Sequence, residues 1–235
     1  MIVQIYTLQS VEEALEVESV GVHNIGLAPA SIGLPGEISY ETAKSICDKV
    51  QNSKTVALSV SNNIDEIIEM VMFVKPDILH LCGEPGELNT SRVKILRDRL
   101  QSNDMEIPIM QAISVEDMSA VEFAKEYEDV SDYFILDTST SLVKGVGASG
   151  KVHDWNVSKA IVDSVKIPVV LAGGLSPENV REAIERVKPW GVDSLTHTNK
   201  TLDDGNFVKD IIKVREFFIN ATRSCKKKRE YIRRC

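Results

Sequence analysis

The sequence predicts a (β/α)8 TIM barrel in a single domain. Eight short β-type runs are each followed by a stretch with helical periodicity, and several of these runs are apolar almost throughout. Strict alternation of strands and helices implies βαβ units around a parallel sheet, and apolar runs suit strands that are buried on both faces. Eight such units in 235 residues fit the length of this barrel. A doubly wound open sheet is the alternative, but it usually carries a glycine-rich turn after its first strand, and "IYTLQS" has no glycine.

The first five units follow from local patterns. The first strand is expected at "IVQIY" and its helix at "SVEEALEVESVG", where Ser10 fits the N-cap and Glu13 its capping-box partner. The second unit joins "VHNIGLAPA" to a helix around residues 40–51. The third, fourth and fifth units join "KTVALSV" to "NIDEIIEMVMFV", "PDILHLCGE" to "LNTSRVKILRDRLQ", and "IPIMQAIS" to "EDMSAVEFAKEYE".

The last three units complete the ring. "DYFILDTS" is followed by a glycine loop and the helix "WNVSKAIVDSV". "IPVVLAGG" leads into "SPENVREAIERV", where Ser176 fits the N-cap, Pro177 the N1 position and Asn179 the N3 position. "GVDSLTHT" leads into "FVKDIIKVREFF". No linker or low-complexity segment interrupts the pattern, so residues 1–220 are expected to form the barrel and residues 221–235 a basic C-terminal tail.

Composition excludes several classes of protein. A net charge of -8 argues against a nucleic-acid binder, although the last eleven residues, "CKKKREYIRRC", are basic. The four cysteines show no CxxC spacing, which favours reduced thiols in the cytoplasm. No stretch approaches the roughly 18 apolar residues of a membrane span, and the N-terminus lacks the features of a signal peptide. We therefore expect a cytoplasmic protein without a membrane partner, with homodimerisation left open.

The loop "GVGASGK" at residues 145–151 matches most of a nucleotide-binding P-loop. A P-loop needs Ser or Thr after the lysine to hold magnesium, and this chain has Val152 there. The helix after the loop starts only near Trp155. We therefore expect the loop to cover a sugar phosphate after strand six, and not to bind a nucleoside triphosphate.

A phosphate site is expected where strands seven and eight end. In (β/α)8 barrels the active site lies at the carboxyl ends of the strands, and phosphate often binds after strands seven and eight. Gly173 and Gly174 would let backbone N–H groups approach an anion closely, although a tight turn alone would also explain them. Ser194 and Thr196 end strand eight beside this position, and His197 follows them.

Acid–base groups are expected on strands six and four. Alternation places Tyr133, Ile135 and Asp137 on one face of strand six, so that Asp137 stands at the mouth of an apolar strand. Burial there would raise the pKa of its carboxyl and suit acid–base chemistry, whereas a cap or an ion pair is the structural alternative. His80 and Cys82 share one face of strand four. The structural alternative for Cys82 is that it serves only as a small buried hydrophobic residue.

Further candidates come from the remaining strand ends. Gln111 on strand five and Asp193 on strand eight are candidate substrate contacts, and Tyr6 ends strand one. The four histidines share no metal-ligand spacing such as H-x-x-x-H, so no metal is expected.

Four motifs carry a family resemblance. "LCGEPGEL", "ILDTSTS", "GASGKVHDW" and "LAGGLSPENVREAIERVKPWGVD" together resemble phosphoribosylanthranilate isomerases of tryptophan biosynthesis. The likeness runs to about residue 218 and is most specific from Asp132 to Asp193. It implies a cofactor-free barrel that converts an aminoaldose phosphate to an aminoketose phosphate by an Amadori rearrangement.

The resemblance also implies roles for particular positions. Asp137 matches the family's general acid, the region of Gly173, Gly174 and 194–198 its phosphate site, and Asp193 its strand-eight aspartate. The chain departs from the family in four places. Tyr6-Thr7 stands where the family has its cysteine base and a glycine, Gly36 lies in the stretch that carries an arginine for the anthranilate carboxylate, Cys82 replaces a histidine, and Leu195-Thr196-His197 replaces Ser-Ser-Gly.

Three functions follow from this pattern. The first is an isomerase of phosphoribosylanthranilate in which Tyr6, Cys82 or His197 stands in for the usual base. The second is a family member acting on another phosphorylated sugar as an isomerase, epimerase or lyase. The third is a non-catalytic protein that binds a phosphorylated metabolite on the same barrel.

Overall fold

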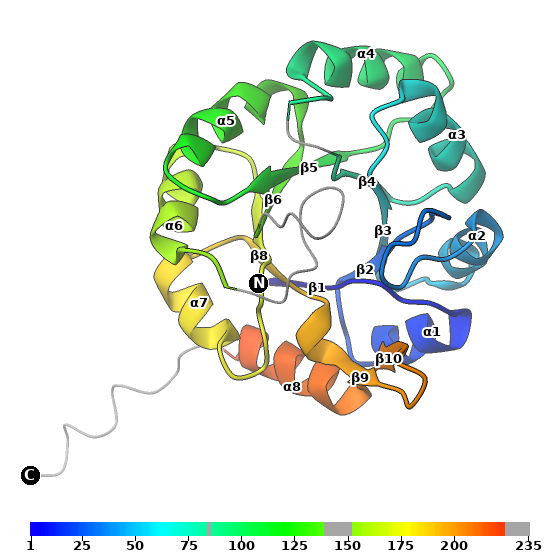
Figure 1. The fold of residues 1–235 in the computed structure, drawn as a ribbon, viewed down its shortest axis with the longest axis vertical. Helices are drawn as coiled ribbons and strands as arrows, with labels where there is room; N and C mark the ends of the chain where they lie inside the picture. The colour runs from blue at the N-terminus through cyan, green and yellow to red at the C-terminus, as the bar shows by residue number, and fades with distance from the viewer. Residues whose placement is uncertain (84–85, 139–151, 224–235) are drawn as a thin grey trace, which may run out of the picture.

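The computed structural model describes residues 1–83, 86–138 and 152–223. Eight parallel strands close into a barrel in sequence order, with β1 pairing β8, and helices surround them (Figure 1). The predicted (β/α)8 barrel is thereby confirmed. The barrel strands are β1 (Ile2–Ile5), β2 (Asn24–Leu27), β3 (Lys54–Ser59), β4 (Ile78–Leu81), β5 (Ile109–Ser114), β6 (Tyr133–Asp137), β7 (Val169–Leu171) and β8 (Gly191–Ser194).

All the barrel helices except α5 and α7 begin where a polar side chain accepts a hydrogen bond from a backbone N–H group. Ser10, Ser39, Asn63 and Asn89 each accept one at the start of the first four helices, which satisfies donors that have no partner within the helix. The helices are α1 (Val11–Ser19), α2 (Tyr40–Lys49), α3 (Ile64–Val74), α4 (Thr90–Gln101), α5 (Ser119–Tyr127), α6 (Trp155–Ser164), α7 (Val180–Val187) and α8 (Ile211–Thr222), with 3-10 turns η1 (Glu128–Val130) and η2 (Thr196–Thr198).

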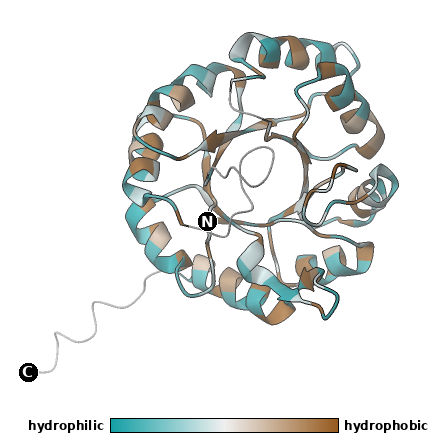
Figure 2. Cartoon of the chain, in the orientation of Figure 1, coloured by the Kyte–Doolittle hydropathy of each residue, from teal (hydrophilic) through white to brown (hydrophobic). Residues whose placement is uncertain are grey.

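The core has two layers that follow from strand alternation. Figure 2 shows apolar strands in the ring and polar residues along the outer helices. The larger layer lies between strands and helices, and the smaller one fills the barrel interior. The interior layer consists of Tyr6, Val56, Ile78, Cys82, Met110, Ala112, Ile135, Val170 and Ala172. Inward-pointing residues of each strand therefore lead directly to the mouth of the barrel.

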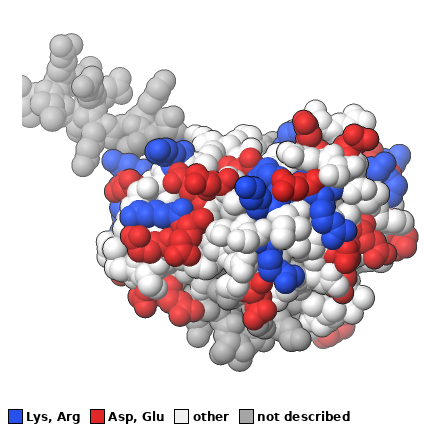
Figure 3. Space-filling view, turned by 90° about the horizontal axis from the view of Figure 1, so that it is seen from above, with Lys and Arg blue, Asp and Glu red and all other residues white. Residues whose placement is uncertain are grey.

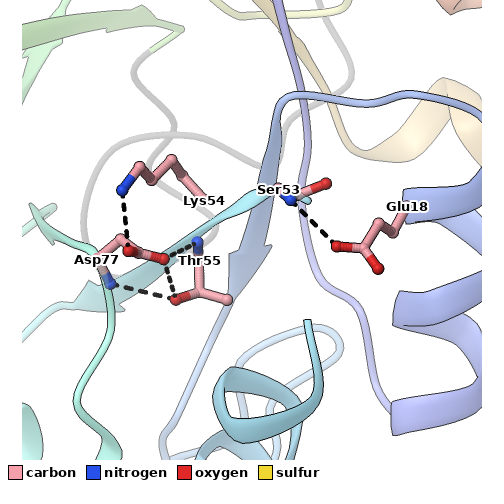
Figure 4. Close-up of polar contacts among 5 residues, drawn as sticks. All are labelled: Glu18, Ser53, Lys54, Thr55 and Asp77. Atoms are coloured by element: carbon pink, nitrogen blue, oxygen red, sulfur yellow. Dashed lines mark hydrogen bonds and ion pairs between the residues drawn. The ribbon is translucent and has the colours of Figure 1, made fainter. Parts of the chain in front are cut away.

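Polar contacts join neighbouring strands at their amino ends (Figure 4). The carboxylate of Asp77, just before β4, accepts the backbone N–H and the hydroxyl of Thr55 on β3 at 2.8 and 3.0 Å. Glu18 at the end of α1 accepts the N–H of Ser53 at 3.1 Å. These contacts fix the end of the barrel opposite to the one that carries the expected site, as is usual for stabilising residues of this fold.

The last unit differs from its expected form. Residues 207–209 were expected to begin a helix, but they form strand β10 (Phe207–Lys209), which pairs antiparallel with β9 (Asn199–Thr201). Asp204-Gly205 turns this hairpin, with Gly205 at φ +85°, as an Asp-Gly pair favours. Asp210 then accepts the N–H groups of Ile212 and Lys213 and starts α8.

Two helix starts also differ in detail. Ser10 accepts the N–H of Glu13 as expected, but the Glu13 carboxylate returns to the N–H of Gln9, one residue before the cap. α7 begins at Val180, so Pro177 lies in a preceding turn and not at N1. Ser176 and Asn179 still exchange contacts in this turn, because the Ser176 N–H donates to Asn179 Oδ1 at 2.8 Å.

The surface in Figure 3 carries acidic and basic side chains side by side. In the described ranges no helix is long and apolar enough to cross a membrane. The loop "GVGASGK" and the basic residues 224–235 lie outside the described residues, so the roles expected for them stay predictions.

Candidate active site

One cavity opens at the carboxyl ends of the barrel strands, with a volume of about 810 Å³ when its open mouth is included. Its wall contains residues of β3, β4, β6 and β8, and residues that follow β1, β2, β3, β4, β7 and β8. The predicted site residues that line it are Tyr6, His80, Cys82, Asp137, Gly173, Gly174, Asp193, Ser194, Thr196 and His197.

Asp137 ends β6 and faces this cavity. It shares the inward face with Ile135, as alternation predicts. Burial raises the pKa of its carboxyl from 3.8 to about 7, while the Thr138 N–H, which donates to Oδ1 at 2.6 Å, opposes the increase. A carboxyl that titrates near neutral pH can deliver or accept a proton under ordinary conditions.

Asp193 on β8 is a second carboxyl in the same cavity, and it is only 6% exposed. Burial and the charge of Asp137 raise its pKa to about 8, against the effects of Gln4 and Lys209. Its Oδ1 has no hydrogen-bond partner among the described residues. The two carboxyls therefore titrate as a coupled pair around neutral pH.

Tyr6 and His80 form a buried pair on the cavity floor. The Tyr6 hydroxyl and His80 Nδ1 lie 2.7 Å apart. Burial and the charge of Asp193 raise the pKa of Tyr6 well above 10, and burial lowers the pKa of His80 to about 3. Both side chains are thus neutral at pH 7, which makes Tyr6 a weak proton acceptor. His80 Nε2 has no partner within the described ranges.

The Tyr6 ring fits because position 26 on β2 is glycine. A Cβ at Gly26 would lie 2.5 Å from Tyr6 Cγ and Cδ2, closer than real Cβ atoms approach. We expect Gly26→Ala to lower the free energy of unfolding by about 1–3 kcal/mol through overpacking, measured by urea denaturation. In the double variant with Tyr6→Ala the Gly26→Ala cost should largely disappear. Strictly additive costs would contradict this contact.

The loops after β7 and β8 contact each other where a phosphate site is expected. Gly173 and Gly174 have φ of +77° and +64°, a conformation that glycine adopts without strain. The Ser194 hydroxyl donates to the Leu175 carbonyl at 2.8 Å, so it joins the two loops. Thr196 and His197 form the exposed turn η2 at the rim. The Ser194 hydroxyl is thus engaged by the protein itself.

His153 lies beside the candidate site, between the end of β6 and helix α6. Its Nε2 lies 2.6 Å from Ser158 Oγ on α6, and its Nδ1 lies 3.2 Å from Thr138 Oγ1. A Cβ at Gly173 would lie 2.6 Å from His153 Nδ1. Burial lowers the pKa of His153 to about 4. This neutral imidazole therefore joins the end of β6 to the glycine turn after β7.

Lys209 was not anticipated because its segment was expected to be helical. Its buried ammonium donates to Asn199 Oδ1 at 2.5 Å, to the Leu195 carbonyl at 3.3 Å and to Thr7 Oγ1 at 3.4 Å. Burial lowers its pKa to about 7. Thr7 has φ +62°, which is strained for a β-branched residue. Lys209 thus fixes the ends of β1 and β8 relative to each other.

Gln111 lies outside this cavity, contrary to its expected substrate contact. Alternation turns Met110 and Ala112 into the barrel, so Gln111 points outward into a smaller cavity beside Phe123 and Tyr127. Its Nε2 donates to the Ala112 carbonyl at 3.0 Å. Across the described ranges, no three His, Cys, Asp or Glu side chains are arranged to hold a metal ion.

Comparisons with known proteins agree with this geometry. A family model described as N-(5'phosphoribosyl)anthranilate (PRA) isomerase matches residues 3–220. The N-(5'-phosphoribosyl)anthranilate isomerase of Methanocaldococcus jannaschii is 30% identical over 214 residues, which cover 88% of this chain and 90% of that protein. The enzyme of the same name from Methanocella arvoryzae is 36% identical over 153 residues, which cover 63% of this chain and 65% of that protein.

Solved structures show the same likeness. A phosphoribosyl anthranilate isomerase from Thermotoga maritima is 28% identical with a TM-score of 0.75, over 94% of this chain and 98% of that one. Another structure from that organism, of monomers generated from the dimeric enzyme, is 26% identical with a TM-score of 0.73 and the same coverage. A phosphoribosyl anthranilate isomerase structure in complex with reduced 1-(o-carboxyphenylamino)-1-deoxyribulose 5-phosphate is 25% identical with a TM-score of 0.72, again over 94% and 98% of the two chains.

Proposed function

Because the chain belongs to the N-(5'-phosphoribosyl)anthranilate isomerase family, we propose that it catalyses an Amadori-type isomerisation of an N-substituted aminoaldose phosphate. The observation that carries the proposal is the cavity itself. It places a carboxyl with a pKa of about 7, that of Asp137, in one wall with a glycine turn, Gly173-Gly174, suited to a phosphate. Family relatives that bear this activity support the reaction class.

The phosphate would lie against the loops after β7 and β8. The N–H groups of the Gly173–Gly174 turn and of η2 would donate to its oxygens, as in other anion sites built from consecutive backbone N–H groups. This contact would hold the sugar so that its C1 and C2 lie near Asp137 and Asp193. Positioning of this kind supplies a large part of the rate acceleration in many enzymes.

Ring opening would use Asp137 as general acid. The protonated carboxyl gives its proton to the ring oxygen as the bond from C1 to that oxygen breaks, and the nitrogen lone pair forms the C1=N bond. The carboxylate so formed remains in the buried wall, close to the iminium cation that it stabilises.

Removal of the C2 proton would use the Asp193 carboxylate. Asp193 lines the cavity and its buried Oδ1 has no hydrogen-bond partner among the described residues, whereas the raised pKa of Tyr6 makes the phenol a poor base. The electron pair of the C2–H bond forms the C1=C2 bond, and the C1=N electrons return to nitrogen. Protonation at C1 by the Asp193 carboxylic acid and transfer of the C2 hydroxyl proton to the Asp137 carboxylate then give the ketone and restore both carboxyls.

The neutral pair of Tyr6 and His80 would orient the sugar hydroxyls. A Tyr6 hydroxyl that stays protonated donates to His80 Nδ1, which leaves the proton of the neutral imidazole on Nε2. That N–H would then donate to a substrate oxygen. A neutral imidazole can polarise an oxygen in this way without giving up its proton.

The reaction is tested by following carbon 2 of the sugar. Ribose 5-phosphate labelled with 13C at C2 is condensed with aniline or with anthranilate, and each glycosylamine is incubated with the protein. We expect the C2 signal to move from a carbinol to a keto position with at least one of the two amines. No conversion of either, by a protein that still binds inorganic phosphate, would contradict the isomerase and favour a non-catalytic binding protein.

A further inference from the structure

The cavity has two chemically different halves. The half formed by β6, β7, β8 and their loops carries the two carboxyls and the glycine turn, together with Ile135, Leu175 and Leu195. The opposite half, formed by β3, β4 and the loops after β2, β3 and β4, is lined by Ala28, Leu34, Pro35, Leu58, Val60 and Cys82, with His80 as its one polar side chain among the described lining residues. A ligand whose phosphate lies in the polar half therefore extends its other end towards an apolar wall.

The loop that carries Leu34 and Pro35 is held in place by Glu37. One carboxylate oxygen of Glu37 accepts the backbone N–H groups of Ile32, Gly33 and Leu34, each at 2.9 Å. The backbone of Ile38 also pairs with Ala28, because its N–H donates to the Ala28 carbonyl at 3.0 Å. The apolar residues of this loop are thus presented to the cavity by a closed hydrogen-bonded turn.

The next position of the loop, Gly36, has little room for a side chain, because Phe207 and Thr7 pack against it. Gly36 has φ +68°, and a Cβ there would lie 2.8 Å from Phe207 Cζ and 3.0 Å from Thr7 Cβ. Phe207 belongs to the β9–β10 hairpin, and Thr7 is held by Lys209. The Lys209 ammonium donates to three protein oxygens and does not line the cavity.

A carboxylate on the ligand would be unfavourable in this half. It would lose water against apolar side chains, and none of the described residues that line the cavity is a lysine or an arginine. When Asp137 and Asp193 are ionised they would also repel it. An uncharged ring or alkyl group would instead bury apolar surface against the same wall, which is favourable.

We propose that the amine part of the substrate is an uncharged apolar group, such as a phenyl or alkyl amine, and not an aryl carboxylate. The apolar wall of Leu34, Pro35, Leu58 and Val60 selects it. This inference rests on the proposed isomerisation, because it assumes that the phosphate occupies the loops after β7 and β8.

Two unreactive analogues test the inference by isothermal titration calorimetry. They are 1-phenylamino-1-deoxyribitol 5-phosphate and its 2-carboxyphenylamino counterpart, with inorganic phosphate as the third probe. We expect the phenyl compound to bind at least about tenfold more tightly than the carboxyphenyl compound, a difference of about 1.4 kcal/mol. Equal affinity, tighter binding of the carboxyphenyl compound, or no binding of either analogue by a protein that binds phosphate would overturn the inference. No binding of any of the three probes would refute the proposed function itself.

A variant of the wall sharpens the test. Leu34 is half-buried at the rim, so a longer side chain can be accommodated there. Leu34→Arg should raise the affinity for the carboxyphenyl compound at least about tenfold relative to the phenyl compound, with phosphate affinity unchanged, because a guanidinium binds a carboxylate bidentately. The matched variant Leu34→Met should keep the wild-type preference. An unchanged preference in a folded Leu34→Arg protein would count against the wall as the selecting element.

Discussion

Asp137→Asn is expected to reduce kcat/KM of the isomerisation by about a thousandfold, within the usual range for loss of general acid–base catalysis. Asparagine keeps the shape of the side chain and its contact with the Thr138 N–H, but it has no proton to give to the ring oxygen. The rate of keto product formation from the better of the two glycosylamines measures the effect. Affinity for inorganic phosphate should change little, because the proposed phosphate site lies on other loops.

The stability of this variant separates a catalytic loss from misfolding. Burial raises the Asp137 pKa from 3.8 to about 7, so its contribution to stability is present below pH 4 and is lost as pH rises through 7. Asparagine removes this loss, and Asp137→Asn should therefore melt at or above the wild-type temperature at pH 8. The matched control is Asp163→Asn, which changes an exposed carboxylate on α6 that is paired with Lys159 and lies outside the cavity, and it should leave activity unchanged. A fully active Asp137→Asn would refute the acid assignment.

The pH profile of Asp193→Asn is expected to lose one of its two limbs. In the wild type, kcat/KM should follow a narrow bell with limbs near pH 7 and 8, since the active form has Asp137 protonated and Asp193 ionised. Because the pKa of Asp193 is the higher of the two, this active form is the less populated of the two singly protonated forms. Below the bell both carboxyls are protonated and no base remains, and above it both are ionised and no acid remains. Asp193→Asn should lower the maximal rate by about a hundredfold to a thousandfold and leave only the decline at high pH.

The comparison with Asp137→Asn shows which carboxyl is the base. In Asp137→Asn the residual activity should keep only the rise with pH, and its midpoint should fall below 8, because the charge of Asp137 is one cause of the raised Asp193 pKa. A wild-type-like bell in the Asp193→Asn protein would mean that another group removes the C2 proton.

The fold could be predicted from the sequence because each unit repeats the same local pattern. The strand pattern also identified the inward faces of β4 and β6, which carry His80 and Asp137. The predicted substrate contact of Gln111 was wrong, because it rested on the position of the residue along β5. The alternation of neighbouring side chains decides which face of the strand a residue occupies, and it turns Gln111 away from the barrel interior.

Contacts between distant segments could not be predicted from local patterns. The hairpin at Phe207–Lys209 follows an Asp-Gly turn, but the periodicity of α8 overlapped it and concealed the Lys209 contact with Thr7. The pairing of Tyr6 with His80 joins residues 74 positions apart, and no local motif encodes it. The departure of Tyr6-Thr7 from the family pattern is therefore explained only by the side chains that pack around these two residues.

The contacts of Lys209 also have a consequence for synthesis of the chain. The N–H of Lys209 donates to Glu13, 196 residues earlier, and its ammonium reaches Thr7, 202 residues earlier. β1 likewise gains its second neighbour only when β8 is made. During synthesis on the ribosome, β1 can therefore complete its contacts in the proposed active site only after almost the whole protein has been made. Closure of so long a loop is entropically costly and slow, so the active site should be among the last parts of the molecule to form.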